Sequence, residues 1–312
     1  MTKSLAFVLA VTAFGSFAAC KKTPTGGGGG GGGWVVGKSG LMAAISDEGT
    51  LGRSYDLGST QTLNGIACRY AGEAWVVGDD GTLLYTNDAG ATWSAQEVPT
   101  TSNLRALATQ DTGPVYVAGN SVFLTTSDAG AHWTSVATTA SFRSLAAAQH
   151  GSTVLAVSDD GGVWSFANGA LSRVTTLPGA QSVALSPDGK TAVVAGAGLA
   201  LSRDGGQTWT QLAVDATLSD VNVLDDDGTA VAVGAAGAIA NLSFGSVSLQ
   251  HVGTADLHTV HVASSDDYDA VGVAAGDSGE VLMTHDGGWT WELATNVGRT
   301  VLGVDQIGVG HR

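Results

Sequence analysis

Four aspartates in this chain share one short pattern of hydroxyl, glycine and aromatic residues, and carboxylates at a repeated spacing could do chemistry. The first copy reads Thr86-x-Asp88-x-Gly90-x-Thr92-Trp93. Two carboxylates that face each other across a cleft can act as general acid and base, which is how glycosidic bonds are cleaved. The other copies have their aspartate and tryptophan at Asp128 and Trp133, Asp204 and Trp209, and Asp286 and Trp291.

The same residue types are also those of a tight turn. An Asp side chain accepts backbone N–H groups across a turn. The glycine two residues later tolerates a positive φ, and the tryptophan offers a large apolar face for packing against a neighbouring element. These three roles leave no nucleophile or base over. The pattern therefore predicts a structural turn rather than a catalytic site.

The spacing of the pattern indicates the element that carries it. The four aspartates are 40, 76 and 82 residues apart, which is one period near 40 and two double periods. Degenerate copies fall in the gaps, at residues 165–169 and 241–245, and a partial copy is seen at Asp47-x-Gly49. A tight turn after a β-rich run recurs with the same period, at Gly37, Gly78, Gly119, Ser158, Gly196, Gly234 and Gly276.

Each of the seven units contains four short β-prone runs. In residues 63–98 these runs are 65–69, 74–77, 82–86 and 92–98, and Gly and Asp clusters separate them. No stretch of the chain has the apolar period of an amphipathic helix. The sequence therefore predicts an all-β, seven-bladed β-propeller with four antiparallel strands in each blade.

The ends of the repeat region predict how the propeller closes. The first unit begins at Trp34 in what should be a second strand, and residues 300–307 resemble an innermost strand. We expect the C-terminal strand to complete the first blade, because this pairing removes an open sheet edge. The propeller domain is thus assigned to residues 34–312.

The N-terminal region predicts export and lipid attachment. Residues 1–19 carry one charge, Lys3, followed by an apolar run that ends in small side chains, which is typical of a secretory signal peptide. The segment Phe17-Ala18-Ala19-Cys20 resembles a bacterial lipobox, so Cys20 is expected to carry lipid. Residues 20–33, with eight consecutive glycines, form a flexible tether. The predicted location is the cell envelope, with Cys20 as the attachment to the membrane.

Charge excludes two classes of partner. The chain has 13 basic and 28 acidic residues; without Lys3, Lys21 and Lys22 the domain keeps 10 basic residues against 28 acidic ones. Such a surface repels phosphate backbones and anionic head groups. Nucleic acid binding and electrostatic membrane binding are not expected, and neither is a cofactor, because no Gly-rich stretch precedes a helix. The domain is expected to be monomeric.

An alignment of the units at their innermost strands gives a candidate binding ring. One residue from each blade falls at the same level, two positions before the first buried apolar residue, which is the expected mouth of the central channel. Because Arg forks bind carboxylates, the ring is a hypothetical site for an acidic side chain or a chain terminus. The alternative is that these residues solvate the rim or pair with nearby acids such as Asp220. The ring consists of Asn64, Arg105, Arg143, Gln181, Ser219, His258 and Arg299.

Metal sites are not favoured by the remaining motifs. His258 and His261 are three residues apart on a predicted strand, so they should point to opposite faces. The runs Asp79-Asp80-Gly81 and Asp225-Asp226-Asp227 lack the further ligands of a calcium loop and fit hairpin turns instead. Cys68, in an apolar stretch, is expected to pack as a small hydrophobe.

The period and the run VVGDDGTLLYTNDAGATW, from Val76 to Trp93, resemble the Asp-box, or BNR-repeat, propellers. Among these, the chain is similar to the seven-bladed photosystem II assembly and stability factor family over residues 34–312. That resemblance implies a non-enzymatic protein that binds a client's tail through an Arg-rich surface. Sialidases share the box, but their Phe/Tyr-Arg-Ile-Pro motif is absent here.

The resulting functional hypothesis is a lipid-anchored, non-catalytic propeller that binds proteins or peptides or acts as an assembly factor. A sialidase-like glycoside hydrolase is the alternative from another class, and paired carboxylates across the channel mouth would favour it. A structural surface protein is the third possibility. Binding or catalysis is expected on the face opposite the Asp boxes.

Overall fold

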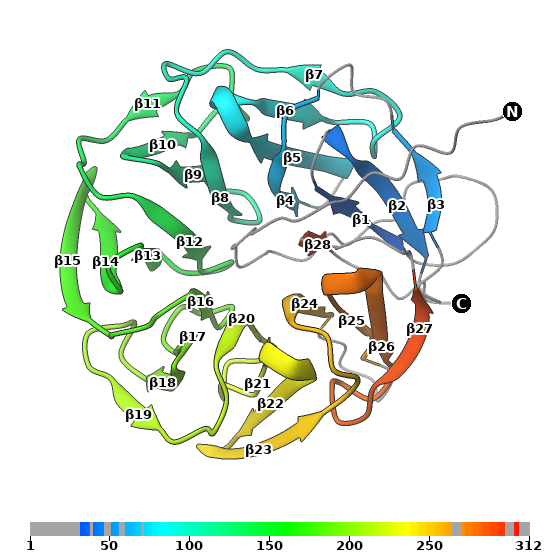
Figure 1. The fold of residues 1–312 in the computed structure, drawn as a ribbon. Helices are drawn as coiled ribbons and strands as arrows, with labels where there is room; N and C mark the ends of the chain where they lie inside the picture. Colours follow the sequence, from blue (N-terminus) through cyan, green and yellow to red (C-terminus); the bar gives the residue numbers. More distant parts are fainter. Residues whose placement is uncertain are drawn as a thin grey trace, which may run out of the picture.

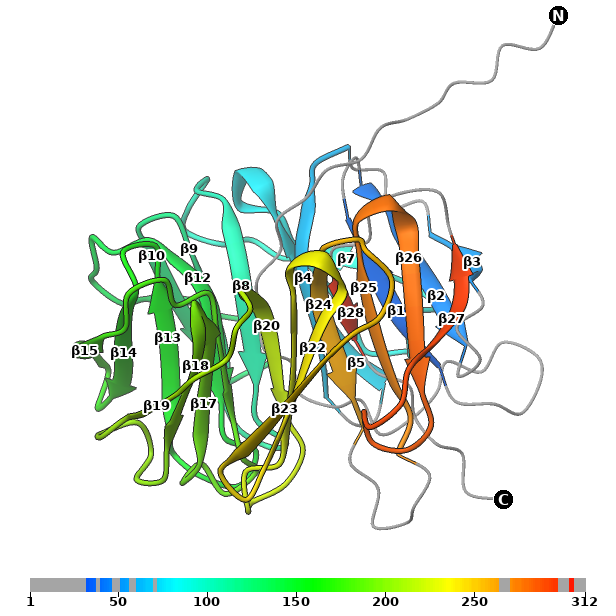
Figure 2. The same cartoon turned by 60° about the horizontal axis from the view of Figure 1, so that its bottom comes forward.

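The computed structural model describes residues 32–37, 40–46, 51–55, 60–69, 72–263, 270–296 and 303–305. These residues form seven four-stranded antiparallel sheets around a common axis (Figure 1). The prediction of an all-β, seven-bladed propeller is confirmed. Short 3₁₀ turns, among them η3 (Asp79–Gly81), η4 (Ala235–Gly237) and η5 (Asp277–Gly279), lie along one edge of the ring (Figure 2).

Blades 1 to 3 are built as follows, from the axis outward. Blade 1 consists of β28 (Gly303–Asp305), β1 (Gly32–Val36), β2 (Met42–Ser46) and β3 (Leu51–Ser54). Blade 2 consists of β4 (Leu63–Arg69), β5 (Glu73–Gly78), β6 (Leu83–Thr86) and β7 (Ser94–Ala95). Blade 3 consists of β8 (Leu104–Thr109), β9 (Val115–Gly119), β10 (Val122–Thr126) and β11 (Thr134–Ser135).

Blades 4 to 7 follow the same order. Blade 4 consists of β12 (Phe142–Ala147), β13 (Val154–Ser158), β14 (Gly162–Ala167) and β15 (Ala170–Thr176). Blade 5 consists of β16 (Ser182–Leu185), β17 (Ala192–Gly196), β18 (Gly198–Ser202) and β19 (Thr210–Leu212). Blade 6 consists of β20 (Leu218–Val223), β21 (Ala230–Gly234), β22 (Ala238–Ser243) and β23 (Ser246–His251). Blade 7 consists of β24 (Leu257–Val262), β25 (Gly272–Gly276), β26 (Glu280–Thr284) and β27 (Glu292–Asn296).

The ring closes in the predicted way. Strand β28 pairs antiparallel with β1, with Gly303 opposite Val36 and Asp305 opposite Trp34. On the axis side, β28 packs between β24 of blade 7 and β4 of blade 2. The first blade is therefore made from both ends of the described chain. Without β28 its sheet would end at β1, and β28 supplies the innermost strand.

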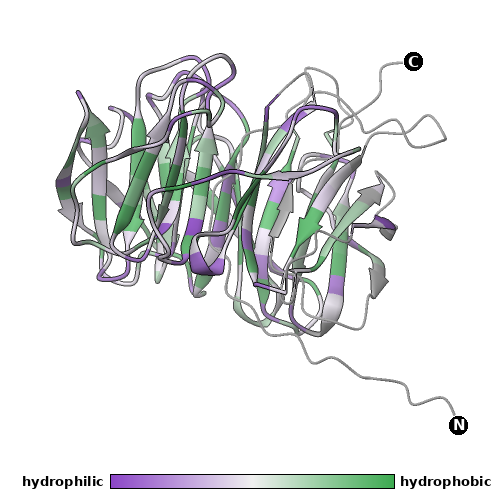
Figure 3. Cartoon of the chain, turned by 90° about the horizontal axis from the view of Figure 1, so that it is seen from above, coloured by the Kyte–Doolittle hydropathy of each residue, from purple (hydrophilic) through white to green (hydrophobic). Residues whose placement is uncertain are grey.

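The core is divided among the seven borders between blades. Seven clusters of buried apolar side chains each join two neighbouring blades. The second strand of each blade is therefore covered on both faces. This explains why runs such as Val115–Gly119 and Ala192–Gly196 are buried throughout instead of alternating. Figure 3 shows hydrophobic residues along the strands and hydrophilic ones at many of the turns. Cys68 is buried in the cluster between blades 1 and 2, as expected.

The Asp boxes are turns between third and fourth strands. In blade 2, Thr86 Oγ1 donates to Asp88 Oδ1 at 2.7 Å and accepts from the Gly90 N–H at 3.0 Å. Asp88 also accepts from the Thr92 N–H at 2.9 Å and from the Thr92 hydroxyl at 2.6 Å. These bonds, those of Thr92 above all, lower the pKa of Asp88 to about 2. The boxes around Asp128, Asp204 and Asp286 repeat this bonding.

The tryptophan of each box packs against the preceding blade. Trp93 lies edge-on to Trp34 of blade 1, with ring centroids 6.0 Å apart. Trp133, Trp209 and Trp291 contact the clusters that join blades 2 and 3, 4 and 5, and 6 and 7. The box therefore fastens the outer part of one blade to its neighbour, which agrees with the predicted structural role.

Blades 4 and 6 have a different outer hairpin where the sequence has degenerate boxes. Their third and fourth strands are joined by two-residue turns, Asn168-Gly169 and Phe244-Gly245, in which all four residues have positive φ. The outer strands β15 and β23 are then 7 and 6 residues long, against 2 residues in β7 and β11. Of the predicted fourth run of blade 2, 92–98, only Ser94–Ala95 is a strand, because Thr92 and Trp93 belong to the box. The partial copy at Asp47 and Gly49 lies outside the described residues.

Candidate functional site at the rim of the innermost strands

Six members of the predicted ring lie at equivalent places at the start of the innermost strands. In five blades the ring residue is the extra residue of a β-bulge, since the register with the second strand shifts across it. In blade 5, Gln181 directly precedes the first residue of β16. A bulge turns a side chain out of the regular alternation of the strand. We call this set the rim: Asn64, Arg105, Arg143, Gln181, Ser219 and His258.

A second tier of residues stands next to the rim. It is formed by the residue that follows each second strand, in the turn to the third strand. Asn64 Nδ2 donates to Asp79 Oδ1 at 2.9 Å, and also to the carbonyl of Leu104 in blade 3 at 2.9 Å. His258 Nε2 lies 3.0 Å from Asp277 Oδ1. The rim therefore lies on the face of the turns between second and third strands, opposite the Asp boxes, as predicted.

Two arginines of neighbouring blades share one carboxylate. Arg105 Nη1 lies 3.0 Å from both carboxylate oxygens of Asp159. Arg143 Nε donates to Asp159 Oδ1 at 3.1 Å, and its Nη2 donates to the Asp159 carbonyl at 3.2 Å. The Asp159 side chain is 42% exposed, whereas those of Arg105 and Arg143 are 23% and 17% exposed. The cluster holds two positive charges and one negative charge, so a local cationic excess remains on an acidic protein.

The rim is free of acidic second-tier residues at blades 5 and 6. The equivalent positions there are Ala197 and Ala235, and Gln181 accepts a hydrogen bond from Arg143 Nη1 instead. The second-tier acids Asp79 and Asp277 belong to blades 2 and 7. An anionic group is therefore favoured most near Arg105, Arg143 and Gln181 of blades 3 to 5, where two arginines outnumber the one carboxylate of Asp159.

The seventh ring residue, Arg299, lies outside the described residues. The register of β28 bears on its assignment, since Gly303 stands opposite Val36 as Gly65 stands opposite Val77 in blade 2. Asn64 precedes Gly65 by one residue, but Arg299 precedes Gly303 by four. The strand pairing therefore gives no support to the place of Arg299 in the ring.

A belt of buried polar side chains lies one position below the rim. Ser182 Oγ donates to Asp220 Oδ1 at 2.8 Å, and the Val260 N–H donates to Asp220 Oδ2 at 3.1 Å. Ser144 accepts from the Val183 N–H at 3.0 Å in the same way. Burial raises the pKa of Asp220 to about 7. Asp220 thus bonds within the wall of the propeller and is not the partner of a rim arginine that the sequence suggested.

The two histidines of β24 point to different surroundings. His258 is on the rim, whereas His261 is only 3% exposed and neither ring nitrogen has a hydrogen-bond partner. Burial lowers the pKa of His261 to about 4, so the ring is neutral at ordinary pH. Within the part of the chain that the structure describes, no group of three or more His, Cys, Asp or Glu side chains could hold a metal ion. Asp79–Gly81 forms the turn η3, and Asp225 caps its own turn by accepting from the Thr229 N–H at 2.8 Å.

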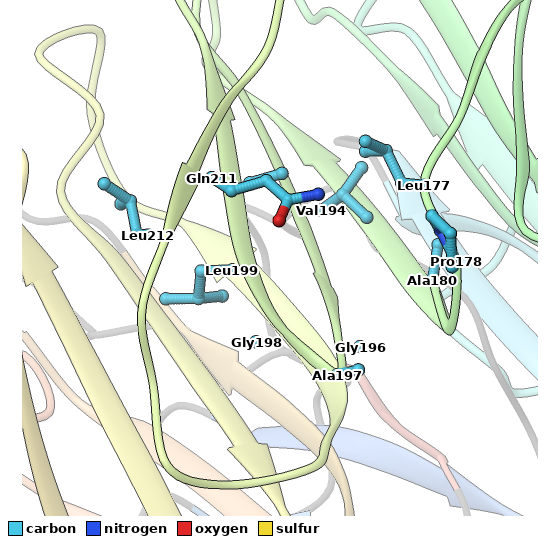
Figure 4. Close-up of a pocket in the computed structure, with 11 residues that line it drawn as sticks. Leu177, Pro178, Ala180, Val194, Gly196, Ala197, Gly198, Leu199, Gln211 and Leu212 are labelled. Carbon is cyan, nitrogen blue, oxygen red and sulfur yellow. The ribbon is translucent and has the colours of Figure 1, made fainter.

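An apolar pocket adjoins the rim on blade 5 (Figure 4). It measures about 70 Å³ and is lined by residues of the connection into β16 and of strands β17 to β19, with Gln211 as the one amide among leucine, valine, alanine and proline side chains. Its volume is far below the roughly 300 Å³ at which pockets for drug-sized ligands begin. A larger and more open hollow of about 520 Å³ lies on the opposite face, between Gln110–Gly113 and Gln149–Gly151.

The second tier is the part of the site that sequence reasoning missed. Its signal was present, because Asp79, Asp159 and Asp277 all follow the periodic turn residues Gly78, Ser158 and Gly276. The turns were recognised, but the pairing of Asp159 with an arginine 54 residues earlier depends on the packing of two blades. Among the helices of the described ranges, none has the length and the apolar character needed to cross a membrane.

Comparisons with known proteins agree with this fold. A family model described as photosynthesis system II assembly factor YCF48 matches residues 52–143, which is less than half of the chain. No curated protein matches the sequence. The solved structure of YCF48 bound to D1 peptide is 18% identical, with a TM-score of 0.64 over 90% of this chain and 92% of that one.

Two further solved structures have similar scores. YCF48 from Cyanidioschyzon merolae is 14% identical, with a TM-score of 0.65 over 91% of this chain and 96% of that one. The WD40 β-propeller domain of Doa1 is 13% identical, with a TM-score of 0.65 over 88% and 91%. At these identities the structures show a shared fold. The chain is similar to the YCF48 assembly factors and to BNR-type propellers, as the repeats predicted.

Proposed function

We propose that this protein is a lipid-anchored propeller of the bacterial cell envelope that binds a protein or peptide client and serves as an assembly factor without a catalytic step of its own. The observation that carries the proposal is the cluster of Arg105, Arg143 and Asp159 on the rim. Two guanidinium groups there already hold a carboxylate in the geometry that a client's acidic side chain or chain terminus would use.

The comparisons support the kind of partner. The matching family is described as an assembly factor, and one similar structure has a peptide bound. A binding role is also supported by the second tier, since Asp79, Asp159 and Asp277 are each bonded to a rim side chain. Asp220, on the innermost strand β20, is buried in the wall and bonded to Ser182 and Val260.

The anchor is the second part of the proposal, and its support is in the sequence. Cys20 follows a signal-like segment and precedes eight glycines. A Cys20→Ser chain should move from the membrane fraction to the soluble fraction of the envelope and should lose labelled lipid. Retention of both by that variant would contradict the anchor.

The test of binding is crosslinking in intact envelopes, followed by purification of the propeller and mass spectrometry. The double variant Arg105→Ala, Arg143→Ala should lose the clients that the parent chain captures. Arg203→Ala is the matched control, because Arg203 is an exposed cation in the Asp box of blade 5, on the opposite face. Equal capture by the parent and the double variant would sink the rim as the binding site.

A further inference from the structure

Large apolar side chains are exposed on one part of the propeller only, as far as the structure describes it. Four such residues occur, and all belong to the outer strands and turns of blades 6 and 7. Phe244 is 82% exposed and Leu249 37%, both in the hairpin of β22 and β23; Trp289 is 54% and Leu293 59% exposed, in and after the Asp box of blade 7. We call these four residues the aromatic edge.

Phe244 has a backbone conformation that its side chain disfavours. It opens the turn between β22 and β23 with a φ of 48°, in the left-handed region. The equivalent turn of blade 4 has Asn168 there, with a φ of 52°. Asparagine tolerates this region because its side chain can bond locally, whereas a bulky residue is an outlier. Since Phe244 is also almost fully exposed, burial does not compensate for the strain, which indicates a use outside the fold.

Trp289 is unusual for its place in the Asp box. It occupies the position between the box glycine and the following hydroxyl residue, where the other three boxes have Ala91, Ala131 and Gln207. The structural tryptophan of this box is Trp291, which packs against the cluster of blades 6 and 7. Trp289 is therefore a second, exposed tryptophan in a turn whose packing against blade 6 is already provided by Trp291.

The two turns lie on one face of neighbouring blades. Gln250 Nε2 donates to the Trp289 carbonyl at 3.1 Å, so the end of β23 remote from Phe244 contacts the box of blade 7. Both turns connect a third to a fourth strand, so they lie at the edge from which second strands start. The second strand β1 starts at that edge with Gly32.

The charge around the aromatic edge selects among apolar partners. Residues 238–251 and 286–296 contain no Lys or Arg, so anionic head groups gain nothing from this surface. Tryptophan and phenylalanine are suited to the boundary between head groups and acyl chains, because their rings are apolar and Trp also carries a polar N–H. A neutral bilayer interface meets both conditions.

We propose that the aromatic edge rests in the interface of a zwitterionic phospholipid bilayer and thereby turns the rim away from the membrane. The inference rests on the proposed lipid anchor at Cys20, which keeps the edge near the bilayer through a tether with a reach of about 20 Å. Membrane contact then comes from two elements, the lipid and the aromatic edge. The rim on the opposite face is left open to clients from the aqueous side.

The test measures contact of Trp289 with lipid and holds the domain at the membrane independently of Cys20. A histidine tag takes the place of residues 1–20, and the chain is bound to phosphatidylcholine vesicles that contain nickel-chelating lipid. Brominated phosphatidylcholine quenches tryptophan fluorescence on contact. We expect a loss of emission for the parent chain, and Trp289→Ala should remove most of this loss. Phe244→Asn should reduce the loss of emission. It should also raise the melting temperature, because it gives the turn of blade 6 the asparagine that blade 4 has at the equivalent position.

A control moves the tryptophan to the opposite face. In the double variant Trp289→Ala, Ala197→Trp the ring stands at an exposed position in the turn between the second and third strands of blade 5, beside the rim, and quenching should stay low. Equal quenching by this variant would overturn the proposal, since any exposed tryptophan near the vesicle would then respond. Unchanged quenching in Trp289→Ala, or a dimer in solution that Trp289→Ala makes monomeric, would overturn it as well. Because the tag replaces Cys20, these outcomes are independent of the lipid anchor.

Discussion

At the scale of single residues, the two arginines of the rim already bind a carboxylate of the protein itself. Asp159 lies between Arg105 and Arg143 and is still 42% exposed. It keeps two cations of neighbouring blades in place, and it competes with any carboxylate from outside. For the acidic client that we propose, the affinity would therefore depend on how much more strongly the two arginines bind the client's carboxylate than that of Asp159.

Replacing this internal carboxylate gives a prediction with an unusual sign. Asp159→Asn removes the negative charge and leaves a side chain that can still accept a hydrogen bond, so an acidic client should be captured more strongly, by roughly tenfold if one charged hydrogen bond is freed. Capture in intact envelopes measures the effect. Asp160→Asn is the control, because the carboxylate of Asp160 is next in sequence but pairs with Arg173 and not with a rim arginine. Weaker capture by Asp159→Asn would mean that the acid positions the arginines rather than competing.

A second residue with a measurable consequence is Asp220. Burial raises its pKa to about 7, from the usual 3.8 of an aspartate. Between these two values the native state holds a proton that the unfolded state has released, so this group lowers stability as the pH rises from about 4 to about 7. His261 acts in the opposite direction, since its pKa is lowered from 6.5 to about 4 and its contribution is lost as the pH falls through that range.

The prediction for Asp220 follows from that sign. Asp220→Asn should remove the decline of the unfolding free energy between pH 4 and 7, and the contribution of His261 should then appear as a rise with pH. The new amide can donate to Ser182 Oγ and accept from the Val260 N–H, so both contacts survive. Urea denaturation at a series of pH values measures the change. An unaltered pH profile would show that Asp220 does not titrate in this range.

At the scale of elements, the Asp box works as a fastener between blades, and its tryptophan is the part that reaches the neighbour. Trp209 contacts the cluster of blades 4 and 5, and its Nε1 donates to the Gly206 carbonyl at 2.9 Å. Blades 4 and 6 lack a box and have longer outer strands in its place. The two designs are alternative ways to stabilise the outer part of a blade.

This contrast allows a paired measurement on two tryptophans of the same kind of turn. Trp209→Ala should lower the unfolding free energy by roughly 2 to 3 kcal/mol, somewhat less than for a fully buried aromatic, because the ring is only partly covered. Trp289→Ala should leave it nearly unchanged, because that ring is 54% exposed. Chemical denaturation gives both values. Similar losses for the two variants would contradict the assignment of Trp289 to a surface role.

The strands and turns also show which features of the fold and the site could be predicted from the sequence. Period and turn residues were enough for the number of blades, the box turns and six rim positions, because all of these depend on local spacing. The shared partner of Arg105 and Arg143 was out of reach, since it depends on how blades 3 and 4 pack. Arg299 was assigned by spacing alone, but β28 is paired in a register that places Gly303 opposite Val36. The exposure of Phe244 and Trp289 could not be predicted from the sequence either, because a large apolar residue in a repeat is first expected in the core.

At the scale of the whole molecule, closure depends on a short strand. Only Gly303–Asp305 is described in β28, yet it lies between β24 and β4 and pairs with β1. Without it, β1 would expose its backbone to the axis of the ring, and the borders of blade 1 would lose a neighbour. An open edge of that kind favours association with other chains.

Truncation tests this dependence. A chain that ends at residue 302 should lose on the order of 3 kcal/mol, since three residue pairs with β1 disappear at roughly 1 kcal/mol each, and it should also aggregate. The control ends at Asp305 and keeps all described pairs. Denaturation midpoints and light scattering separate the two. Equal stability of both chains would show that closure by β28 is dispensable.

The pairing of β1 on both sides also determines how the propeller responds to mechanical force. A pull on the segment before Gly32 acts along β1, whose hydrogen bonds to β28 and β2 lie across the direction of the pull. Such a load shears two ladders at once instead of opening one bond at a time, which is the more resistant geometry. In the proposed anchored protein, a load on the N-terminal segment would therefore have to break both ladders of β1 before the first blade opens.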